Sequence, residues 1–351
     1  MTQKRMAIGL IATLFLVSIV IALSWVRFLH SPVITSEPGY QYTVQPGNSI
    51  KTVINDLYFK NIIHNRLYFY FLVRLRGDAH DLKAGEYFFS KGITPTKMLN
   101  QMMTGTGLIY HSFTIIPGWS FKELREAILK QPNLRHTIQN MSDSELMTLL
   151  GHPVLVPEGR FFPDTYYYAG GVSDIVLLKR AFKTMQKKLD IAWEQRTANL
   201  PYKDENEVLI AASLIEKEAY LNDERPIIAG VLVNRLQKDM LLQIDPTVIY
   251  GMGSRYEGKI HRGDLLENTP YNTYVHKGLP PAPIAMPSIE SIMAVVHPAK
   301  NDYLYYVARG DGSHQFSITY TEHQAVVNET NKLSEGFFNT DLLRYHLKKF
   351  L

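Results

Sequence analysis

The chain has 351 residues, with 37 Lys and Arg against 33 Asp and Glu, and it has no cysteine. This length predicts two folded units, since a domain commonly takes about 100–200 residues. The lack of cysteine excludes disulfides, thiolate metal sites and a cysteine nucleophile. Charges of both signs are mixed along the chain, so the basic stripe of a nucleic-acid-binding protein is missing and we expect no nucleic-acid partner.

The N-terminus predicts a membrane anchor. Residues 1–5 are basic, and residues 6–26 form an apolar run whose polar members are Thr13, Ser18 and Ser24. About 20 such residues cross a bilayer as a helix, whereas the apolar core of a cleavable signal peptide has about 7–15. We therefore favour an uncleaved single-pass anchor in the inner membrane over a cleaved signal. The basic tail then stays cytoplasmic, and the rest of the chain lies outside the cytoplasm.

A linker at residues 27–39 and a small module at residues 40–107 are predicted next. The module should contain a strand, two helices and a second strand, at 40–46, 49–59, 64–77 and 85–92, and then a helix between Thr94 and Gly105. Its opening, YTVQPGNSI, resembles the LysM module, which implies a βααβ fold that recognises glycans containing N-acetylglucosamine. A spacer that holds the next domain off the membrane is an equal alternative.

Residues 108–340 predict a larger, mixed α+β catalytic domain. Ser120 and Glu123 should form a capping box at the start of a helix, and residues 206–221 should form a strong helix. Two long segments, 242–253 and 269–288, are rich in turn residues and are predicted as loops, and two strands, 302–310 and 314–319, follow them.

The helix predicted at 206–221 carries Glu216 and Glu218. On a helical wheel with Val208 at zero, the large apolar side chains centre near about 250°, Glu218 falls at about 280° and Glu216 at about 80°. Glu218 is therefore expected on the apolar face and Glu216 on the solvent face. Burial raises the pKa of a carboxyl group, as a general acid requires. A buried ion pair or a capping role for Glu218 is the alternative, and from the wheel alone the more frequent one.

Five segments together resemble the YceG-like family, over the chain from the anchor to about residue 330. They read EGRFFPDTY, ASLIEKEA, VLVNRLQKDMLLQIDPTVIYGMG, PYNTYVHKGLPPAPIAMPS and HPAKNDYLYYVARGDGSHQFSIT. The resemblance implies a carbon–oxygen lyase that cuts peptidoglycan strands internally, between N-acetylmuramic acid (MurNAc) and N-acetylglucosamine (GlcNAc), leaving 1,6-anhydro ends. It also implies that Glu218 is the catalytic acid, and it points to penicillin-binding proteins as partners and to a role in limiting the length of nascent strands.

The loops that match the family supply candidates for sugar binding. Amides, hydroxyls and aromatic rings bind acetamido sugars, and the candidates are Gln243, Asp245, Thr247, Tyr271, Asn272 and Tyr274. His297 is interpreted as structural, since no cluster of metal-ligand spacing surrounds it. We expect no metal or nucleotide cofactor. The alternative to an enzyme is a membrane-tethered scaffold that binds peptidoglycan and recruits cell-wall synthases.

Overall fold

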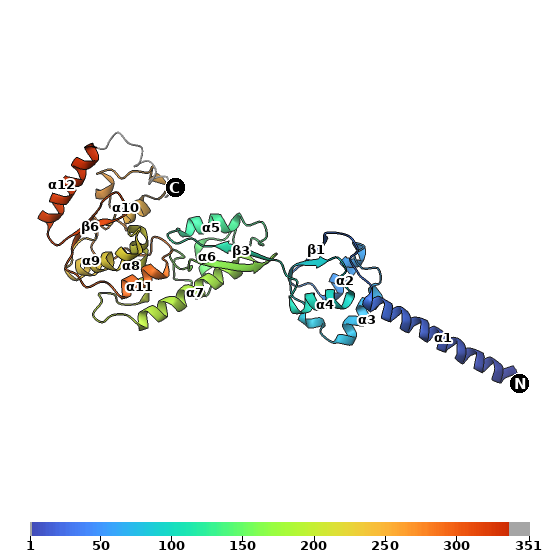
Figure 1. The fold of residues 1–351 in the computed structure, drawn as a ribbon. Coiled ribbons are helices and arrows are strands. Elements are labelled where there is room, and N and C mark those ends of the chain that lie inside the picture. Colours follow the sequence, from blue (N-terminus) through green and yellow to red (C-terminus); the bar gives the residue numbers. More distant parts are fainter. Residues whose placement is uncertain (1, 337–351) are drawn as a thin grey trace. The chain divides into compact units, whose positions relative to one another are not determined.

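The computed structural model describes residues 2–336 (Figure 1). Residues 337–340 of the predicted catalytic domain lie outside the described residues. The chain forms two compact units. Unit 1 holds the chain up to Phe113 with residues 131–136 and 167–174, and unit 2 holds residues 114–130, 137–166 and 175 onward. The predicted domain boundary at residue 108 stays a prediction.

Helix α1 (Thr2–His30) contains the predicted anchor. Its segment Arg5–His30 is the one helix of the described chain that is long and apolar enough to cross a membrane. The hydroxyls of Thr13 and Ser18 donate to carbonyl oxygens four residues back, so these polar groups are satisfied within the helix. At its C-terminal end Trp25, Phe28 and Leu29 pack against the core of unit 1.

Unit 1 has the predicted order of strand, helix, helix and strand. The strands β1 and β2 pair antiparallel from Gly39 opposite Ser90 to Val44 opposite Gly85, and the predicted Thr94 and Gly105 cap α4. The segment predicted as a linker is bonded to this unit, because the Val33 N–H donates to the Ile93 carbonyl at 2.7 Å. The elements are β1 (Gly39–Val44), α2 (Ile50–Phe59), α3 (Arg66–Arg76), η1 (Ala79–Asp81), β2 (Gly85–Ser90) and α4 (Pro95–Thr104).

The rest of the chain is mainly helical, with two further pairs of strands, β3 with β4 and β5 with β6. Its core is built on α8, which packs against α9, α10 and α11. The elements are β3 (Tyr110–Thr114), α5 (Phe121–Leu129), α6 (Asp143–Leu149), β4 (Thr165–Ala169), α7 (Asp174–Glu194), α8 (Glu205–Glu218), η2 (Asn222–Glu224), α9 (Arg225–Gln237), α10 (Asp245–Met252), η3 (Gly253–Arg255), η4 (Asp264–Leu266), α11 (Ile289–Val296), β5 (Tyr305–Ala308), β6 (His314–Ser317) and α12 (Tyr320–Gly336).

This architecture confirms a mixed α+β fold and corrects one element. The capping box of Ser120 and Glu123 is present, and β5 and β6 lie in the two segments predicted as strands. The predicted loop at 242–253 was wrong, because α10 occupies most of it. Pro246 lies in the first turn of this helix, where its missing N–H costs no hydrogen bond, so a residue interpreted as a loop signal instead starts a helix.

Candidate active site

The site begins at the C-terminal end of α8. The helix ends at Glu218, three residues earlier than predicted, and Ala219 is already extended. Every residue from Val208 to Ile215 is buried, because neighbouring helices cover α8 on several sides. A helix enclosed in this way has no single solvent face, so its wheel cannot separate buried from exposed positions on its own.

The Glu218 carboxyl group lies among apolar side chains with one hydrogen bond. Tyr306 on β5 donates its hydroxyl to Glu218 Oε2 at 3.1 Å. Loss of hydration raises the pKa of Glu218 to about 7, and the charge of Asp245 acts in the same direction, whereas Tyr306 and Arg235 oppose the rise. The C-terminal end of a helix also disfavours negative charge. Near neutral pH this carboxyl group is thus both a proton donor and, once deprotonated, a base.

A small cavity of about 10 Å³ adjoins Glu218. This is the space of about one water molecule, so a sugar ring does not fit in it. Apart from Glu218, Arg235 and Tyr306, the cavity is lined by apolar residues: Ile215, Ile228, Val231, Leu232, Leu242 and Ile244. It keeps the carboxyl group poorly hydrated on its inner side.

Arg235 brings a buried positive charge toward Glu218, and sequence reasoning missed it. Its side chain on α9 donates to the carbonyls of Leu304 at 2.6 Å and Leu242 at 2.7 Å. It therefore joins α9 to the residue before β5 and is held in one position. The missed signal is its spacing, since Arg235 follows Ile228, Val231 and Leu232 at helical intervals. That is a charge on an apolar face, the same pattern that selected Glu218.

The strand pair β5–β6 holds Tyr306 in place. His314 on β6 contacts the Tyr306 ring edge-on, with ring centroids 5.4 Å apart. The same histidine is fixed by Glu224, which accepts from its backbone N–H at 2.9 Å and lies 2.7 Å from its Nδ1. Glu224 belongs to η2, directly after the helix of Glu218. Glu224 and His314 therefore link the segment after α8 to Tyr306, in addition to the hydrogen bond between Tyr306 and Glu218. Sequence analysis did not predict this link.

Three of the predicted sugar-binding residues gather near Glu218. Asp245, exposed at the start of α10, accepts a hydrogen bond of 2.5 Å from the Tyr274 hydroxyl. Both are close enough to Glu218 to interact with its charge. Gln243 is exposed, has a φ of 54°, and accepts from Arg235 Nη1 at 3.3 Å. These three side chains form a polar rim beside the acid.

The other three residues predicted to bind sugar do not belong to the polar rim. Thr247 and Asn272 have no exposed surface. Thr247 Oγ1 lies 2.9 Å from Thr273 Oγ1 and so joins α10 to the loop that follows η4, and Asn272 donates to the Glu267 carbonyl at 2.7 Å within that loop. Tyr271 contacts the ring of Tyr250, at 4.7 Å between centroids. It belongs to the surroundings of another carboxyl group, that of Glu158.

Glu158 is a second carboxyl group with a raised pKa, of about 7, caused by loss of hydration, and its side chain is buried. The Phe121 N–H, at the start of α5, donates to it at 2.9 Å, and the Tyr250 hydroxyl donates at 3.0 Å. It caps a helix and braces α10. The following Gly159 has no room for a side chain, because a Cβ there would lie 2.5 Å from Pro283. Two of the family-like segments are therefore in direct contact.

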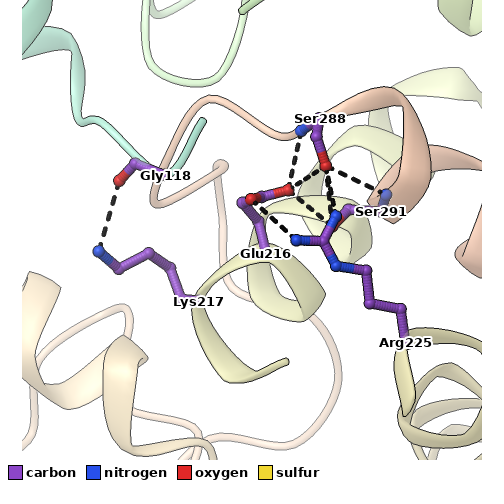
Figure 2. A network of polar contacts seen from close by, with 6 residues as sticks. All are labelled: Gly118, Glu216, Lys217, Arg225, Ser288 and Ser291. Carbon is purple, nitrogen blue, oxygen red and sulfur yellow. Dashed lines mark hydrogen bonds and ion pairs between the residues drawn. The ribbon is translucent and has the colours of Figure 1, made fainter. Parts of the chain in front are cut away.

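The solvent-facing position expected for Glu216 was wrong. Figure 2 shows its carboxylate surrounded by donors, with Ser288 N at 2.9 Å, Ser291 Oγ at 2.7 Å and Arg225 Nη2 at 3.4 Å. Its side chain is 6% exposed. The reason is α11, whose N-terminus covers the face that the wheel assigned to water. Lys217 is exposed and reaches the Gly118 carbonyl at 3.4 Å (Figure 2).

Comparisons with known proteins agree with the motifs. The model of the YceG-like family matches residues 42–329. A protein of Bacillus subtilis strain 168 named endolytic murein transglycosylase is 29% identical over 325 residues, covering 87% of this chain and 86% of the relative. A protein of the same name from Streptococcus pneumoniae strain R6 is 27% identical over 305 residues, and the alignment covers 53% of that longer relative.

A solved structure is similar as well. The 2.6 Å crystal structure of the yceG-like protein lmo1499 from Listeria monocytogenes is 29% identical, with a TM-score of 0.51, and the match covers 83% of this chain and 99% of that one. The family match extends over most of the chain, including Glu218, Arg235 and Tyr306. The chain therefore belongs to the YceG-like family.

Proposed function

We propose that this chain is an endolytic lytic transglycosylase that cleaves peptidoglycan strands between MurNAc and GlcNAc, with Glu218 as its single acid and base. The observation that carries this proposal is one poorly hydrated carboxyl group, with a pKa of about 7, beside a polar rim. The names of the relatives support the same activity. The other carboxylate of the same segment, Glu216, is occupied by donors from α9 and α11.

The chemistry needs one carboxyl group. Protonated Glu218 donates its proton to the glycosidic oxygen, and the bond from that oxygen to C1 of MurNAc breaks, releasing the GlcNAc hydroxyl. The resulting carboxylate takes the proton of the MurNAc C6 hydroxyl, whose oxygen bonds to C1 and closes the 1,6-anhydro ring. No water is consumed and Glu218 ends protonated, whereas an ordinary hydrolase needs a second carboxylate at a defined separation.

Neighbouring residues take supporting roles in this proposal. Tyr306 and Arg235 stabilise the Glu218 carboxylate that exists between the two proton transfers, since both favour its charged form. Gln243, Asp245 and Tyr274 contact the sugar. Tyr271, Thr247 and Asn272 support the loops rather than touch substrate, which revises the role predicted for them.

The test is the chemistry of the products. Purified peptidoglycan is digested with the full chain in detergent, and the fragments are analysed by mass spectrometry. We expect oligosaccharides with 1,6-anhydro ends, and loss of about 10³-fold in rate for Glu218→Gln, the range of a general acid. Glu205→Gln, at the start of the same helix, is the matched control. Reducing ends would overturn the lyase in favour of a hydrolase.

The location and the module of unit 1 complete the proposal. Residues 6–26 cross the inner membrane once, with residues 1–5 in the cytoplasm, so that the enzyme cuts nascent strands near the membrane and limits their length.

Residues 40–107 form a LysM-like module, supported by the strand, helix, helix and strand order and by a polar hollow of about 430 Å³ beside β1 and α2. Penicillin-binding proteins remain predicted partners. The non-catalytic scaffold predicts that Glu218→Gln fully rescues a deletion strain.

A further inference from the structure

Helix α3 carries an apolar stripe that faces away from unit 1. Leu67, Phe71 and Leu75 recur every fourth residue, and their exposed fractions are 69%, 50% and 61%. The opposite side of the helix, with Phe69, Leu72 and Val73, is buried in the core. A helix that is apolar on both sides is unusual at a water-exposed surface, and such a stripe marks a contact surface.

The stripe adjoins the end of α1. The ring of Phe71 lies 5.1 Å from that of Trp25, and the ring of Tyr68 lies 5.6 Å from Trp25. The Tyr68 hydroxyl donates to Ser24 Oγ at 3.1 Å. Helix α3 is therefore packed beside the last turns of the apolar helix, within the same unit.

This packing fixes the level of α3 relative to a membrane. From Arg5 to Trp25 a helix rises about 30 Å, which equals the hydrocarbon thickness of a bilayer. If Arg5 lies at one surface, Trp25 lies at the other. Tryptophan and tyrosine favour that boundary, where an apolar ring and a polar atom are both satisfied. The contacts of Trp25 with Tyr68 and Phe71 thus bring α3 to the headgroup level.

The positive charges beside the stripe also suit contact with the headgroups of a bilayer. Arg66 and Arg74 on α3, and Arg27 on α1, are exposed. On a helical wheel Arg74 falls at one border of the stripe and Tyr68, next to the anchor, at the other. Apolar residues between an anchor and exposed arginines are the pattern of a helix that lies in the membrane surface, with its guanidinium groups near lipid phosphates.

We propose that α3 lies in the headgroup region of the bilayer that α1 crosses, with Leu67, Phe71 and Leu75 inserted among the acyl chains. Unit 1 then has two contacts with the membrane, one spanning and one lying on its surface. The inference rests on the membrane anchor of the proposed function. It is independent of the reaction at Glu218.

The absence of cysteine makes a direct test practicable, because each introduced cysteine is unique. The full chain with Phe71→Cys, labelled with a polarity-sensitive fluorophore, is reconstituted into vesicles of phosphatidylcholine and phosphatidylglycerol. In one set of vesicles some of the phosphatidylcholine carries a nitroxide quencher on the acyl carbons nearest the glycerol, and in a second set it carries the nitroxide near the end of the acyl chain, at the depth expected for Leu14. Leu75→Cys is a second probe, because Phe71→Cys removes the ring contact with Trp25 and that loss could by itself change the result at position 71. Leu14→Cys reports the anchor, and Tyr110→Cys, an aromatic residue on β3 that is 62% exposed, is the matched control.

We expect a blue-shifted emission and strong quenching at positions 71 and 75, and neither at position 110. Quenching at position 14 without quenching at 71 and 75 would overturn the inference and leave the anchor intact. No quenching at position 14 would overturn both. A blue shift at 71 without lipid quenching, together with a disulfide between two unlabelled chains carrying Phe71→Cys after addition of an oxidant, would mean that a second copy covers the stripe. Each variant is also assayed on peptidoglycan, which separates these outcomes from a failure of the proposed reaction.

Discussion

The two glutamates of α8 lie two residues apart in regions of opposite character. Around Glu216, two serines and an arginine donate to one carboxylate at the start of α11. Around Glu218, one tyrosine hydroxyl donates to the carboxyl group, and the cavity beside it is lined by Arg235 and aliphatic side chains. Both are largely withdrawn from water. The number of donors distinguishes them, since hydrogen bonds and a cation compensate a carboxylate for lost hydration and aliphatic side chains do not.

Burial alone therefore does not identify a catalytic carboxyl group. Glu216 joins α8, α9 and α11 and contributes to stability. Glu218 is under-supplied with donors, so its proton is retained up to near neutral pH. We therefore expect that replacing Glu216 lowers the stability of the fold. Replacing Glu218 should lower the reaction rate and raise the stability of the fold.

The largest effect on stability is expected for Glu216→Gln. The change leaves the Arg225 guanidinium without its anionic partner in a site where that side chain is 11% exposed. We expect the free energy of unfolding to fall by about 3 kcal/mol, as measured by urea denaturation. Glu205→Gln, which removes one carboxylate from the first turn of α8, should cost less than about 1 kcal/mol. Unchanged stability with lost turnover would reverse the roles of the two glutamates.

The next effect is a gain of stability for Glu218→Gln that depends on pH. The pKa of Glu218 is raised from 4.5 to about 7 in the folded chain, so the parent protein loses stability as the pH rises through that interval. The amide removes this loss. The variant should equal the parent below pH about 4.5 and exceed it by about 3 kcal/mol above pH about 7. The raised pKa of Glu158 makes the same contribution to the pH dependence of both proteins, so it cancels in their difference. A difference that does not change with pH would contradict a raised pKa.

A smaller effect is expected for Tyr306→Phe. Without the hydroxyl the Glu218 carboxylate loses its donor, so its pKa should rise further and the alkaline limb of kcat/KM should move to higher pH by up to about one unit. The rate at neutral pH should fall by about tenfold, since the carboxyl group is less well held. Tyr303→Phe is the control on the segment that precedes β5. An unshifted limb would show that the tyrosine acts only by packing.

The smallest effect is expected for Tyr274→Phe. One exposed hydrogen bond to Asp245 is lost, which is worth about 1 kcal/mol, or about a fivefold rise in KM. The pH profile should stay in place, because the charge of Asp245 remains. A shifted profile would place Tyr274 beside Tyr306 as a residue that tunes the acid.

Local patterns predicted unit 1 well. Its strands alternate, its helices are short and have capping side chains at their N-termini, and Gly77 and Gly105 end α3 and α4, so most boundaries have a signal within a few residues. In unit 2 the same reasoning found the capping box of Ser120 and the helix of Glu218. It interpreted α10 as a loop, since the proline and the β-branched residues of DPTVIYGM masked a helix start.

The partners of the site could not be predicted in the same way. A wheel describes one helix, and whether Glu216 meets water depends on α11, which begins 73 residues later. The positions of Thr247 and Asn272 likewise depend on how α10 and the loop around Asn272 pack against each other. Arg235 was the exception, because its spacing on α9 carried a readable signal.

The hydrogen bond from Tyr306 joins residues 88 positions apart, and this separation bears on the synthesis of the chain. A polypeptide emerges from the ribosome N-terminus first, and its domains fold in that order. When the glutamate has emerged, the strand that supplies its donor and the carbonyl of Leu304 that holds the arginine are still to be made. The surroundings of Glu218, the proposed acid, are therefore completed only when almost the whole described chain exists. A prematurely terminated product that ends before β5 would keep the glutamate and lack its tuned environment.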